Sequence, residues 1–331
     1  MNFENLEKNI LQIGRQAKES SRYVSQLSTK SKNEILCSAA ENLFKNKELI
    51  LKANELDIKE NKDKLNSATL DRLVLDEKRI ESISNGLVEI SRLEDPVGKV
   101  IEKWSRPNGL KIEKISIPLG VIGVIYESRP NVSADAAGLC LKSGNALILR
   151  GGSESFNSSS KIVEIINCSY EKFKLPTGVL QYIPTKDRNA VGHLLKMDGF
   201  VDVIIPRGGK SLIERVINES KVHVIRHLDG ICDTYIHKSS IANLSKEVAV
   251  NAKMRRPGIC GATETILVDK EVLSTHLPGI IKSLTEMDCE VRGDKHVLDI
   301  NNSLRLANEE DWYTEYLDKI VSIKTIFRGV E

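Results

Sequence analysis

Apolar side chains recur at every third or fourth position over residues 2–93, with polar side chains between them. This spacing is typical of amphipathic helices, because it places the apolar positions on one face. Ser67 and Asp76 precede helical segments, and their side-chain oxygens can accept from the exposed amides of a first turn. The pattern therefore predicts a helical N-terminal region with caps at these two positions. Apolar positions that follow the spacing include Ile35, Ala39, Leu43, Ile80, Ile83, Leu87 and Ile90.

After Pro96 the pattern changes from helical to extended. Two extended stretches flank the turn signal Pro107-Asn108-Gly109 and predict a hairpin. Beyond it, short buried runs alternate with helical segments, which predicts a parallel, doubly wound sheet. The predicted strands are GVIGVI, NALILR, VLQYIPT, VDVIIP and KVHVIRH. The helices between them are ADAAGLCLKSG, SSSKIVEIINCSY, NAVGHLLKM and KSLIERVINES.

A second stretch of alternating elements begins near Cys232. Its predicted helices are ANLSKEVAVNAKM and VLSTHLPGIIKSLTE, and its predicted strands are ATETILVD and KIVSIKTIF. Because the strand and helix order resumes after a break, we expect a second, smaller α/β domain. The fold class predicted for the whole chain is α/β.

The composition excludes several classes of partner. With 331 residues the chain is long enough for two domains, and 48 Lys and Arg against 46 Asp and Glu leave a net charge of +2. No global field then attracts nucleic acid or an anionic membrane, so any anion site must be local. The sequence has no membrane-length apolar run and no leader pattern, which predicts a soluble, unexported protein.

Cysteine and histidine form no metal-site pattern. The six cysteines lie far apart without a C-x-x-C pair, and the six histidines lack metal-ligand spacing. We therefore expect free thiols in a reducing compartment and no bound metal. Cys37, Cys140 and Cys168 fall in helical apolar patterns, where a thiol behaves as a small buried hydrophobe.

Cys260 has a different setting. It follows Arg255 and Arg256 in the loop RRPGICGATET, ahead of the strand ETILV. Arginines and turn amides lower the pKa of a nearby thiol, and a partly exposed loop makes its thiolate accessible. Cys260 is therefore the candidate nucleophile, with a structural cysteine as the alternative.

Two strand ends run into glycine-rich turns that open helices. They are Arg150-Gly151-Gly152-Ser153-Glu154 after NALIL and Arg207-Gly208-Gly209-Lys210 after VDVIIP. Glycine lets the backbone approach an anion, a helix N-terminus presents unpaired amides, and Arg or Lys adds charge. The second turn is the better phosphate site. Neither turn matches G-x-G-x-x-G or the Walker pattern, so two ordinary glycine turns stay an equal alternative.

Asn131 follows another buried strand, in Arg129-Pro130-Asn131-Val132. Ligands of open α/β sheets lie at the carboxyl ends of the strands, where an Asn amide can donate to a developing oxyanion. Taken alone, an Asn here is more often the cap of a helix that begins at Ser133 or Ala134. The pattern leaves both interpretations open.

Two long segments carry a family resemblance. They are PLGVIGVIYESRPNVSADAAGLCLKSGNALILRGGSES and MRRPGICGATETILVD. Both resemble the gamma-glutamyl phosphate reductases, also called glutamate-5-semialdehyde dehydrogenases, of the aldehyde dehydrogenase superfamily. The similarity includes IPRGGKSLIERV and VIRHLDGICDTYI and continues through EEDWYTEYLDKIVSIK to about Lys324. It therefore covers nearly the whole chain.

The resemblance implies a reaction. In it NADPH reduces L-glutamyl 5-phosphate to L-glutamate 5-semialdehyde and phosphate, the second step from glutamate to proline. By the same resemblance Cys260 attacks the acyl phosphate and forms a thioester that hydride reduces. Asn131 and the Cys260 amide are expected to hold the oxyanion. Arg129, Arg255 and Arg256 are candidates for binding the substrate's carboxylate or acyl phosphate.

The resemblance also implies cofactor contacts. The residues expected there are Arg150, Ser153 and Glu154 at the adenosine ribose, Gly208, Gly209 and Lys210 at the phosphates, and Glu315 at the nicotinamide ribose. Arg150 suits a 2'-phosphate by bidentate pairing, which favours NADP, whereas a solvated strand-end arginine is the alternative.

Two departures from the family pattern bear on function. Relatives that hydrolyse their thioester use a glutamate in a segment that here reads His227-Leu228-Asp229-Gly230, which favours reductive chemistry. Family members are also longer, so a C-terminal portion of the catalytic domain is expected to be missing. The alternatives are an inactive, truncated cofactor-binding protein and an NAD-dependent aldehyde dehydrogenase for another substrate.

The resemblance gives the expected organisation. Residues 1–97 and 118–228 form the NADP-binding domain, 98–117 an oligomerisation hairpin, and 229–331 a truncated catalytic domain. The expected partners are a small-molecule substrate, a glutamate 5-kinase that hands over the acyl phosphate, and further copies of the chain. Nucleic acid and membrane are not expected as partners, and the expected location is the cytoplasm.

Overall fold

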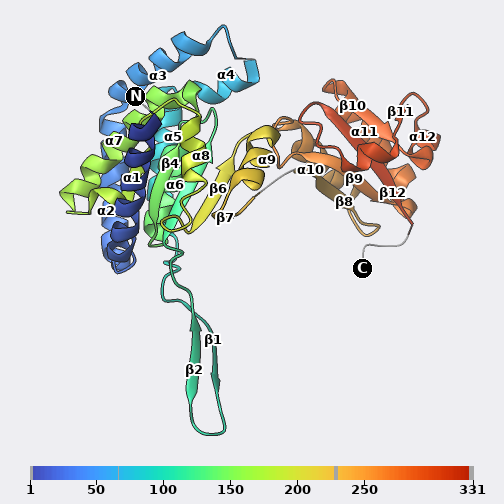
Figure 1. Ribbon diagram of the computed structural model, residues 1–331. Helices are drawn as coiled ribbons and strands as arrows, with labels where there is room; N and C mark the ends of the chain where they lie inside the picture. The colour runs from blue at the N-terminus through green and yellow to red at the C-terminus, as the bar shows by residue number, and fades with distance from the viewer. Residues whose placement is uncertain (1–2, 66, 227–229, 328–331) are drawn as a thin grey trace. The chain divides into compact units, whose positions relative to one another are not determined.

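The computed structural model describes residues 3–65, 67–226 and 230–327, except the side chains of residues 3–5 and 67–68. The chain divides into two compact units, Met1–Arg226 and His227–Glu331, which we call unit 1 and unit 2 (Figure 1). Each unit has its own parallel sheet and its own core. None of the helices in the described residues is long and apolar enough to cross a membrane.

Unit 1 begins with helices, as the apolar spacing predicts. They are α1 Phe3–Val24, α2 Thr29–Lys45, α3 Lys47–Asn61, α4 Ser67–Leu73 and α5 Glu77–Arg92. Asp76 accepts a hydrogen bond from the Arg79 amide, so the predicted cap of α5 is confirmed. α4 begins at Ser67, whose side chain lies outside the described residues, and a cap at this position stays a prediction.

Five parallel strands form the sheet of unit 1, in the order β5-β4-β3-β6-β7. They are β3 Val121–Tyr126, β4 Ala146–Arg150, β5 Leu180–Tyr182, β6 Val203–Arg207 and β7 His223–Val224. The helices between them are α6 Val132–Lys142, α7 Phe156–Lys172, α8 Asn189–Leu194 and α9 Lys210–Glu219, with the 3-10 helices η1 Ser153–Ser155 and η2 Thr177–Val179. The predicted parallel, doubly wound sheet is confirmed.

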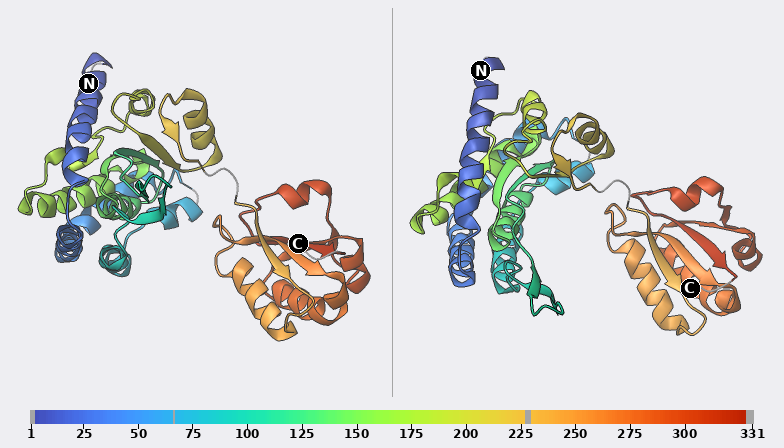
Figure 2. Two further views of the ribbon diagram at one scale, coloured as in Figure 1. Left: turned by 90° about the horizontal axis from the view of Figure 1, so that it is seen from below. Right: turned by 60° about the horizontal axis from the view of Figure 1, so that its bottom comes forward.

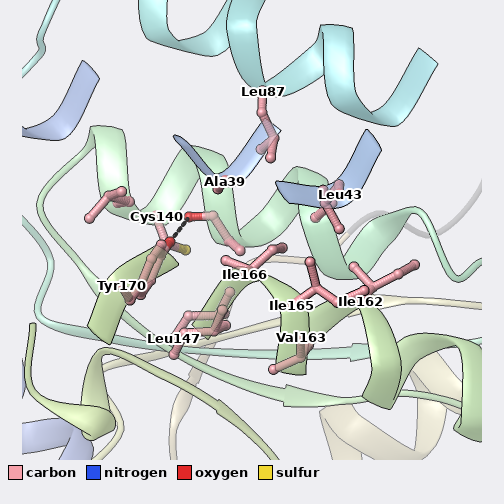
Figure 3. Packing of buried hydrophobic residues seen from close by; sticks show 14 of the residues in the cluster. Ala39, Leu43, Leu87, Cys140, Leu147, Ile162, Val163, Ile165, Ile166 and Tyr170 are labelled. Atoms are coloured by element: carbon pink, nitrogen blue, oxygen red, sulfur yellow. Dashed lines mark hydrogen bonds between the residues drawn. The ribbon is translucent and has the colours of Figure 1, made fainter. Parts of the chain in front are cut away.

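Helices cover both faces of this sheet, and the sequence of β3 reflects it. All of β3 is buried, with Ile122 and Val124 in the core that includes α2, α5, α6 and α7. Figure 3 shows this core around Leu147 and Ile166. Val121 belongs to the opposite core, shared with α1 and α8. Alternate strand residues face opposite sides, so an unbroken apolar run marks a strand buried on both faces.

The three helical cysteines differ in burial. Cys140 is buried, as predicted, whereas Cys37 is half-buried and Cys168 is exposed. The prediction of a buried thiol is therefore wrong for Cys168. α7 turns Ile162 and Ile166 into the core, and Cys168 lies on the remaining, outward side of the helix. All six cysteines of the chain are free thiols.

The predicted hairpin connects α5 to β3. β1 Val100–Ser105 and β2 Lys111–Ile115 pair antiparallel and are mostly exposed. Gly109 has φ +84° at the turn, a left-handed conformation that glycine adopts without steric cost. Figure 1 shows the hairpin extending away from the sheet of unit 1. A two-stranded hairpin without packing partners is only marginally stable in water.

Unit 2 is a smaller α/β layer structure. Its five parallel strands follow the order β11-β10-β12-β9-β8. They are β8 Cys232–Ile236, β9 Thr263–Asp269, β10 Glu290–Gly293, β11 Arg305–Leu306 and β12 Ile320–Ile326. The helices are α10 Ala242–Met254, α11 Leu273–Glu286 and α12 Lys295–Ile300, with the 3-10 helices η3 Lys270–Val272 and η4 Glu309–Tyr313.

α10 and α11 pack against one face of this sheet, where they share a core with Ile266 and Val268 of β9. Both views of Figure 2 show the two helices beside the strands of unit 2. The predicted elements of the second domain are present, and β8, β10, β11 and α12 are additional to them.

Candidate active site

The candidate residues fall into two regions, one in each unit. In unit 1 they lie where β3, β4 and β6 end, at Tyr126, Arg150 and Arg207. These neighbouring strands are parallel, so their carboxyl ends share one edge of the sheet. Open α/β sheets bind their ligands at this edge.

Arg150 ends β4 and is only 5% exposed. Its guanidinium donates to the carbonyl oxygens of Gly151, Lys186 and Asp187. Nε of Arg150 is buried without a hydrogen-bond partner, as is the hydroxyl of Tyr182. Burial lowers the pKa of Arg150 from its ordinary value. The alternative of a solvated strand-end arginine is therefore wrong, because this side chain lies inside the turn.

The turn after β4 encloses the carboxylate of Glu154. One oxygen, Oε1, accepts from the amide of Ser128 at 2.6 Å and from its hydroxyl at 2.9 Å. A Cβ placed on Gly152 would lie 2.2 Å from the same oxygen, so any larger residue there would displace this carboxylate. Ser153 is half-buried beside this carboxylate. Ser153 and Glu154, two of the three predicted contacts of the adenosine ribose, thus lie together at the sheet edge, beside the third, Arg150.

The turn after β6 binds an anionic oxygen that belongs to the chain itself. The amide of Gly209, at the start of α9, donates to Oε2 of Glu127 at 2.9 Å. A Cβ on Gly208 would lie 2.6 Å from that oxygen. Lys210 is exposed in the first turn of α9. Sequence reasoning predicted an anion site here but did not identify Glu127 as its occupant.

Asn131 directly precedes α6, at the capping position, but its side chain does not cap the helix. Its backbone is helical, and its side chain makes no capping hydrogen bond. Nδ2 instead donates to Oδ2 of Asp135 at 2.9 Å. Burial raises the pKa of Asp135, and the Asn131 hydrogen bond opposes that rise. The cap interpretation is wrong. Because an amide nitrogen carries two hydrogens, one remains for a second acceptor.

In unit 2 the candidate nucleophile lies in the loop between α10 and β9. Cys260 is exposed there, and Arg255 and Arg256 are exposed in the same loop. The Cys260 carbonyl oxygen accepts a hydrogen bond from the Cys232 thiol at 3.2 Å. The loop therefore contacts β8 through its backbone while its thiol is accessible.

Gly230 lies directly against this loop. A Cβ placed on Gly230 would be 2.4 Å from the Cys260 carbonyl oxygen and 2.8 Å from Cys260 Cβ. The same atom would be 2.8 Å from Oε1 of Glu315. Cys260 and Glu315 thus converge on one glycine, although 55 positions, the difference between their residue numbers, separate them in sequence. The other three residues of the segment predicted to lack a catalytic glutamate, residues 227–229, lie outside the described part of the chain.

A buried ion pair joins the two ends of the nucleophile loop, residues 255–262 between α10 and β9. Nζ of Lys253, in the last turn of α10, lies 2.7 Å from Oε2 of Glu264 in β9, and both side chains are 0% exposed. Oε1 of Glu264 accepts from the Leu317 amide at 3.4 Å. Burial raises the pKa of Glu264, opposed by the Lys253 hydrogen bond and charge. Sequence reasoning missed this pair. Its one trace in the sequence is a charged residue among the apolar positions of each element, Lys253 in α10 and Glu264 in β9.

The donor atoms at these two regions suit organic anions. Among residues 3–65, 67–226 and 230–327, no cluster of three His, Cys, Asp or Glu side chains could hold a metal ion. The Gly209 amide already binds a carboxylate oxygen, and a phosphate oxygen makes the same demand on a helix N-terminus. The turn after β6 is therefore able to bind an anionic oxygen of this kind.

The chain is similar to known proteins over nearly its full length. The aldehyde dehydrogenase family matches residues 5–298. Gamma-glutamyl phosphate reductase of Paramagnetospirillum magneticum is 47% identical over 95% of this chain and 74% of its own length. The protein of the same name from Brucella suis is 49% identical over 95% of this chain and 75% of its own length.

Solved structures give the same relation. The crystal structure of gamma-glutamyl phosphate reductase from Thermotoga maritima is 35% identical and has a TM-score of 0.88, covering 96% of this chain and 77% of its own. A probable aldehyde dehydrogenase from Listeria monocytogenes, at 14% identity and a TM-score of 0.64, covers 98% of this chain and 76% of its own and shares the fold. The chain thus spans about three quarters of the length of its relatives.

Proposed function

The chain belongs to the gamma-glutamyl phosphate reductases, oxidoreductases of the aldehyde dehydrogenase family that use a nicotinamide cofactor, and we propose that it reduces L-glutamyl 5-phosphate with NADPH. The products are L-glutamate 5-semialdehyde and phosphate, and the step belongs to proline biosynthesis. The observation that carries this proposal is the exposed Cys260 on a loop fixed at both ends by a buried ion pair.

Cys260 is proposed as the nucleophile. Its thiolate attacks the acyl carbon and forms a carbon–sulfur bond. The bond between the acyl carbon and the phosphate oxygen breaks, phosphate departs, and a thioester remains on Cys260. A bound nicotinamide cofactor supplies the hydride. When the resulting tetrahedral centre collapses, the carbon–sulfur bond breaks, the aldehyde leaves and the Cys260 thiolate is regenerated. An exposed loop supports this role, because substrate must reach the sulfur.

Asn131 is proposed as a donor to the oxyanion. Its amide nitrogen holds Asp135 with one hydrogen, which orients the second hydrogen. Removing one donor of this kind costs about a hundredfold to a thousandfold in turnover. The backbone amide of Cys260 is the second proposed donor.

The edge of unit 1 is proposed to hold NADPH. Gly208, Gly209 and Lys210 would bind the phosphates, and Ser153 and Glu154 the adenosine ribose. Support comes from the Gly209 amide, which already binds an anionic oxygen. Glu315 is proposed at the nicotinamide ribose.

The preference for NADPH is part of the proposal, with Arg150 as the residue for the 2'-phosphate. Its guanidinium now donates to the carbonyls of Lys186 and Asp187 at 3.3 Å, and it must release them to pair with a phosphate. Arg150 therefore has a second role, because it orders the turn that carries Ser153 and Glu154. The ratio of kcat/KM for NADPH and NADH in Arg150→Lys tests the first role.

The remaining assignments concern substrate and assembly. Arg255 and Arg256, exposed beside Cys260, and Arg129 are proposed to bind the substrate's carboxylate or phosphate. The hairpin of residues 98–117 is proposed to join copies of the chain, because Trp104 and Ile101 expose apolar surface on it. We also propose a cytoplasmic location and a handover of the labile acyl phosphate from glutamate 5-kinase.

The reverse reaction tests the function, because the acyl phosphate is unstable. Purified protein is supplied with glutamate semialdehyde, NADP and phosphate, and NADPH formation is followed beside a Cys260→Ala variant. Absorbance that rises only with phosphate and only with Cys260 supports the proposal. A folded but silent protein that still binds NADPH would instead be a cofactor-binding protein. Acid formation without phosphate would identify an aldehyde dehydrogenase of the hydrolytic type.

A further inference from the structure

A second cysteine lies next to the candidate nucleophile. Cys232, the first residue of β8, is half-buried, and its sulfur lies 3.2 Å from the carbonyl oxygen of Cys260. A carbonyl oxygen lies about 2.4 Å from its own Cα, so the Cys232 sulfur is within about 6 Å of the Cys260 Cα. The Cys232 sulfur is therefore within reach of the Cys260 side chain after a rotamer change.

The backbone holds these two cysteines close together at more than one point. β8 pairs with β9 in parallel, with Cys232 opposite Thr263, three residues after Cys260. Gly230 packs against the Cys260 Cβ so closely that a methyl group there would be at 2.8 Å. The segment from Gly230 to Cys232 thus contacts the nucleophile loop at both ends.

The two thiols differ in ways that suit an ordered reaction. Cys260 is exposed, whereas Cys232 is half-buried. A reactive, accessible thiolate is the first to be oxidised by peroxide, and its sulfenic acid condenses with a neighbouring thiol. Cys168 is also exposed but lies in unit 1, on the outer side of α7.

We propose that Cys232 is the resolving cysteine of Cys260, so that peroxide converts the pair to a reversible disulfide instead of destroying the nucleophile. The proposal rests on the proposed function in one respect, namely that Cys260 is the reactive thiolate. Hydrogen peroxide transfers one oxygen to the Cys260 thiolate, giving a sulfenic acid and hydroxide. The Cys232 thiol then attacks the sulfenic sulfur, the S–S bond forms, the S–O bond breaks and water leaves. The two sulfurs together lose two electrons to the peroxide.

Burial and nearby negative charge both disfavour the thiolate form of Cys232. Burial raises the pKa of the Cys232 thiol, and the negative charge of Cys260 raises it further. At rest, Cys232 therefore stays protonated and does not compete as a nucleophile. Conversion of Cys260 to an uncharged sulfenic acid removes one of the charges that raise the pKa of Cys232, while burial continues to raise it.

The disulfide can be measured directly on the full chain. Trypsin cuts after Arg226 and Lys238, and after Arg255 and Lys270, so each cysteine falls in a peptide with no other cysteine. The protein is treated with equimolar hydrogen peroxide, alkylated, digested and analysed by mass spectrometry. We expect peptides 227–238 and 256–270 joined by a disulfide that dithiothreitol removes, and two fewer free thiols.

Matched variants test the resolving role. A separate sample is treated with an excess of hydrogen peroxide, because a thiolate consumes two molecules of peroxide on its way to a sulfinic acid. After dithiothreitol is added, the parent and a Cys168→Ser control regain most of their activity. Cys232→Ser keeps the untreated activity but recovers at least about tenfold less, because its Cys260 proceeds to the irreversible sulfinic acid. A parent that forms no 232–260 disulfide, or a Cys232→Ser variant that recovers as fully as the parent, overturns the inference. A protein that forms the disulfide but never reduces its substrate contradicts the proposed function and not this inference.

Discussion

The two candidate regions are stabilised in opposite ways. At the edge of unit 1, the Gly209 amide binds the exposed carboxylate of Glu127, a group that solvent or a ligand can replace. In unit 2 the nucleophile loop is fixed by Lys253 and Glu264, both fully buried. An exposed charge can exchange its partner with little loss of free energy, because water solvates it. A buried charge that loses its partner destabilises the fold strongly. We therefore expect the anion at the Gly209 amide of unit 1 to be exchangeable, and the Cys260 loop of unit 2 to be held in one position.

The largest effect is expected from breaking the buried pair. Lys253→Met leaves the Glu264 carboxylate without its cation in the core of unit 2, which costs about 3–5 kcal/mol of unfolding free energy. Urea unfolding and turnover are measured together. We expect a lower unfolding midpoint and loss of activity, since both ends of the Cys260 loop are released.

Two further variants make this result specific. In Lys253→Met with Glu264→Leu neither charge is left buried, so we expect much of the stability to return. Lys18→Met breaks a pair with Asp202 whose side chains are 39% and 32% exposed, and it should cost no more than about 1 kcal/mol. If Lys18→Met and Lys253→Met lost equal amounts of unfolding free energy, the contrast between exposed and buried charges would not hold.

The second prediction concerns the position of the Cys260 sulfur. Gly230→Ala places a methyl group 2.4 Å from the Cys260 carbonyl oxygen, a backbone atom that must then shift. A displacement of about 1 Å at a reacting group can lower turnover about a hundredfold. We expect kcat to fall strongly. The methyl group would also lie 2.8 Å from Oε1 of Glu315, the end of a flexible side chain that can move away, so we expect a smaller effect on the Kd for NADPH.

Gly258→Ala is the control, because its Cβ would meet only the Leu317 carbonyl at 3.5 Å, an ordinary contact in the same loop. Thiol alkylation kinetics report the same displacement without substrate. If Gly230→Ala turned over as fast as Gly258→Ala, the loop would be less constrained than its packing indicates.

The third prediction tests whether the anion site of unit 1 is exchangeable. Glu127→Gln removes the negative charge that occupies the Gly209 amide, so a cofactor phosphate no longer displaces a carboxylate. A charge at a helix N-terminus contributes about 0.3–1 kcal/mol, so the Kd for NADPH should fall about twofold to fivefold. Fluorescence titration measures it, and Glu89→Gln, on the distant surface of α5, should leave it unchanged. Weaker binding by Glu127→Gln would mean that Glu127 supports the cofactor.

Local patterns in the sequence were enough to predict most of the fold. Strand and helix periods are properties of neighbouring residues, and so the parallel sheet of unit 1 and α10 could be predicted. Residue type and setting likewise marked Cys260 and the Gly208-Gly209 turn. Cys168 shows the limit of this reasoning, because a helical apolar pattern does not tell which side of α7 faces the sheet.

What the sequence could not predict depends on contacts between distant strands. Glu127 meets Gly209 because β3 lies beside β6. Cys232 meets Cys260 because β8 pairs with β9. β8 itself had no predicted boundaries, so its first residue could not be placed against any loop. Pairing partners and register arise from the whole sheet and leave little trace in any one segment.

The smallest effect is expected at an exposed support of unit 1, and it depends on pH. Lys186, whose carbonyl accepts from Arg150, also pairs with Glu60 at 2.7 Å, with side chains 42% and 51% exposed. The Lys186 hydrogen bond and charge hold the pKa of Glu60 below its ordinary value of 4.5. A carboxyl group whose pKa is lower in the folded chain than in the unfolded chain stabilises the fold. This contribution is complete at pH values above the pKa in the unfolded chain, and it is lost as the pH falls through the pKa in the folded chain.

Glu60→Gln should therefore cost a few tenths of a kcal/mol at pH 7 and progressively less as the pH falls below 4.5, because exposed pairs contribute little in water. The unfolding free energies of parent and variant are compared by urea titration at several pH values. A difference that grows on acidification would contradict the sign of the shift. Because Lys253 and Glu264 are shielded from solvent, the loss of unfolding free energy in Lys253→Met should exceed that in Glu60→Gln at pH 7. An exposed pair that solvent can replace is compatible with the proposal that Arg150 releases the Lys186 and Asp187 carbonyls to bind a phosphate, whereas the buried pair of unit 2 allows no such exchange.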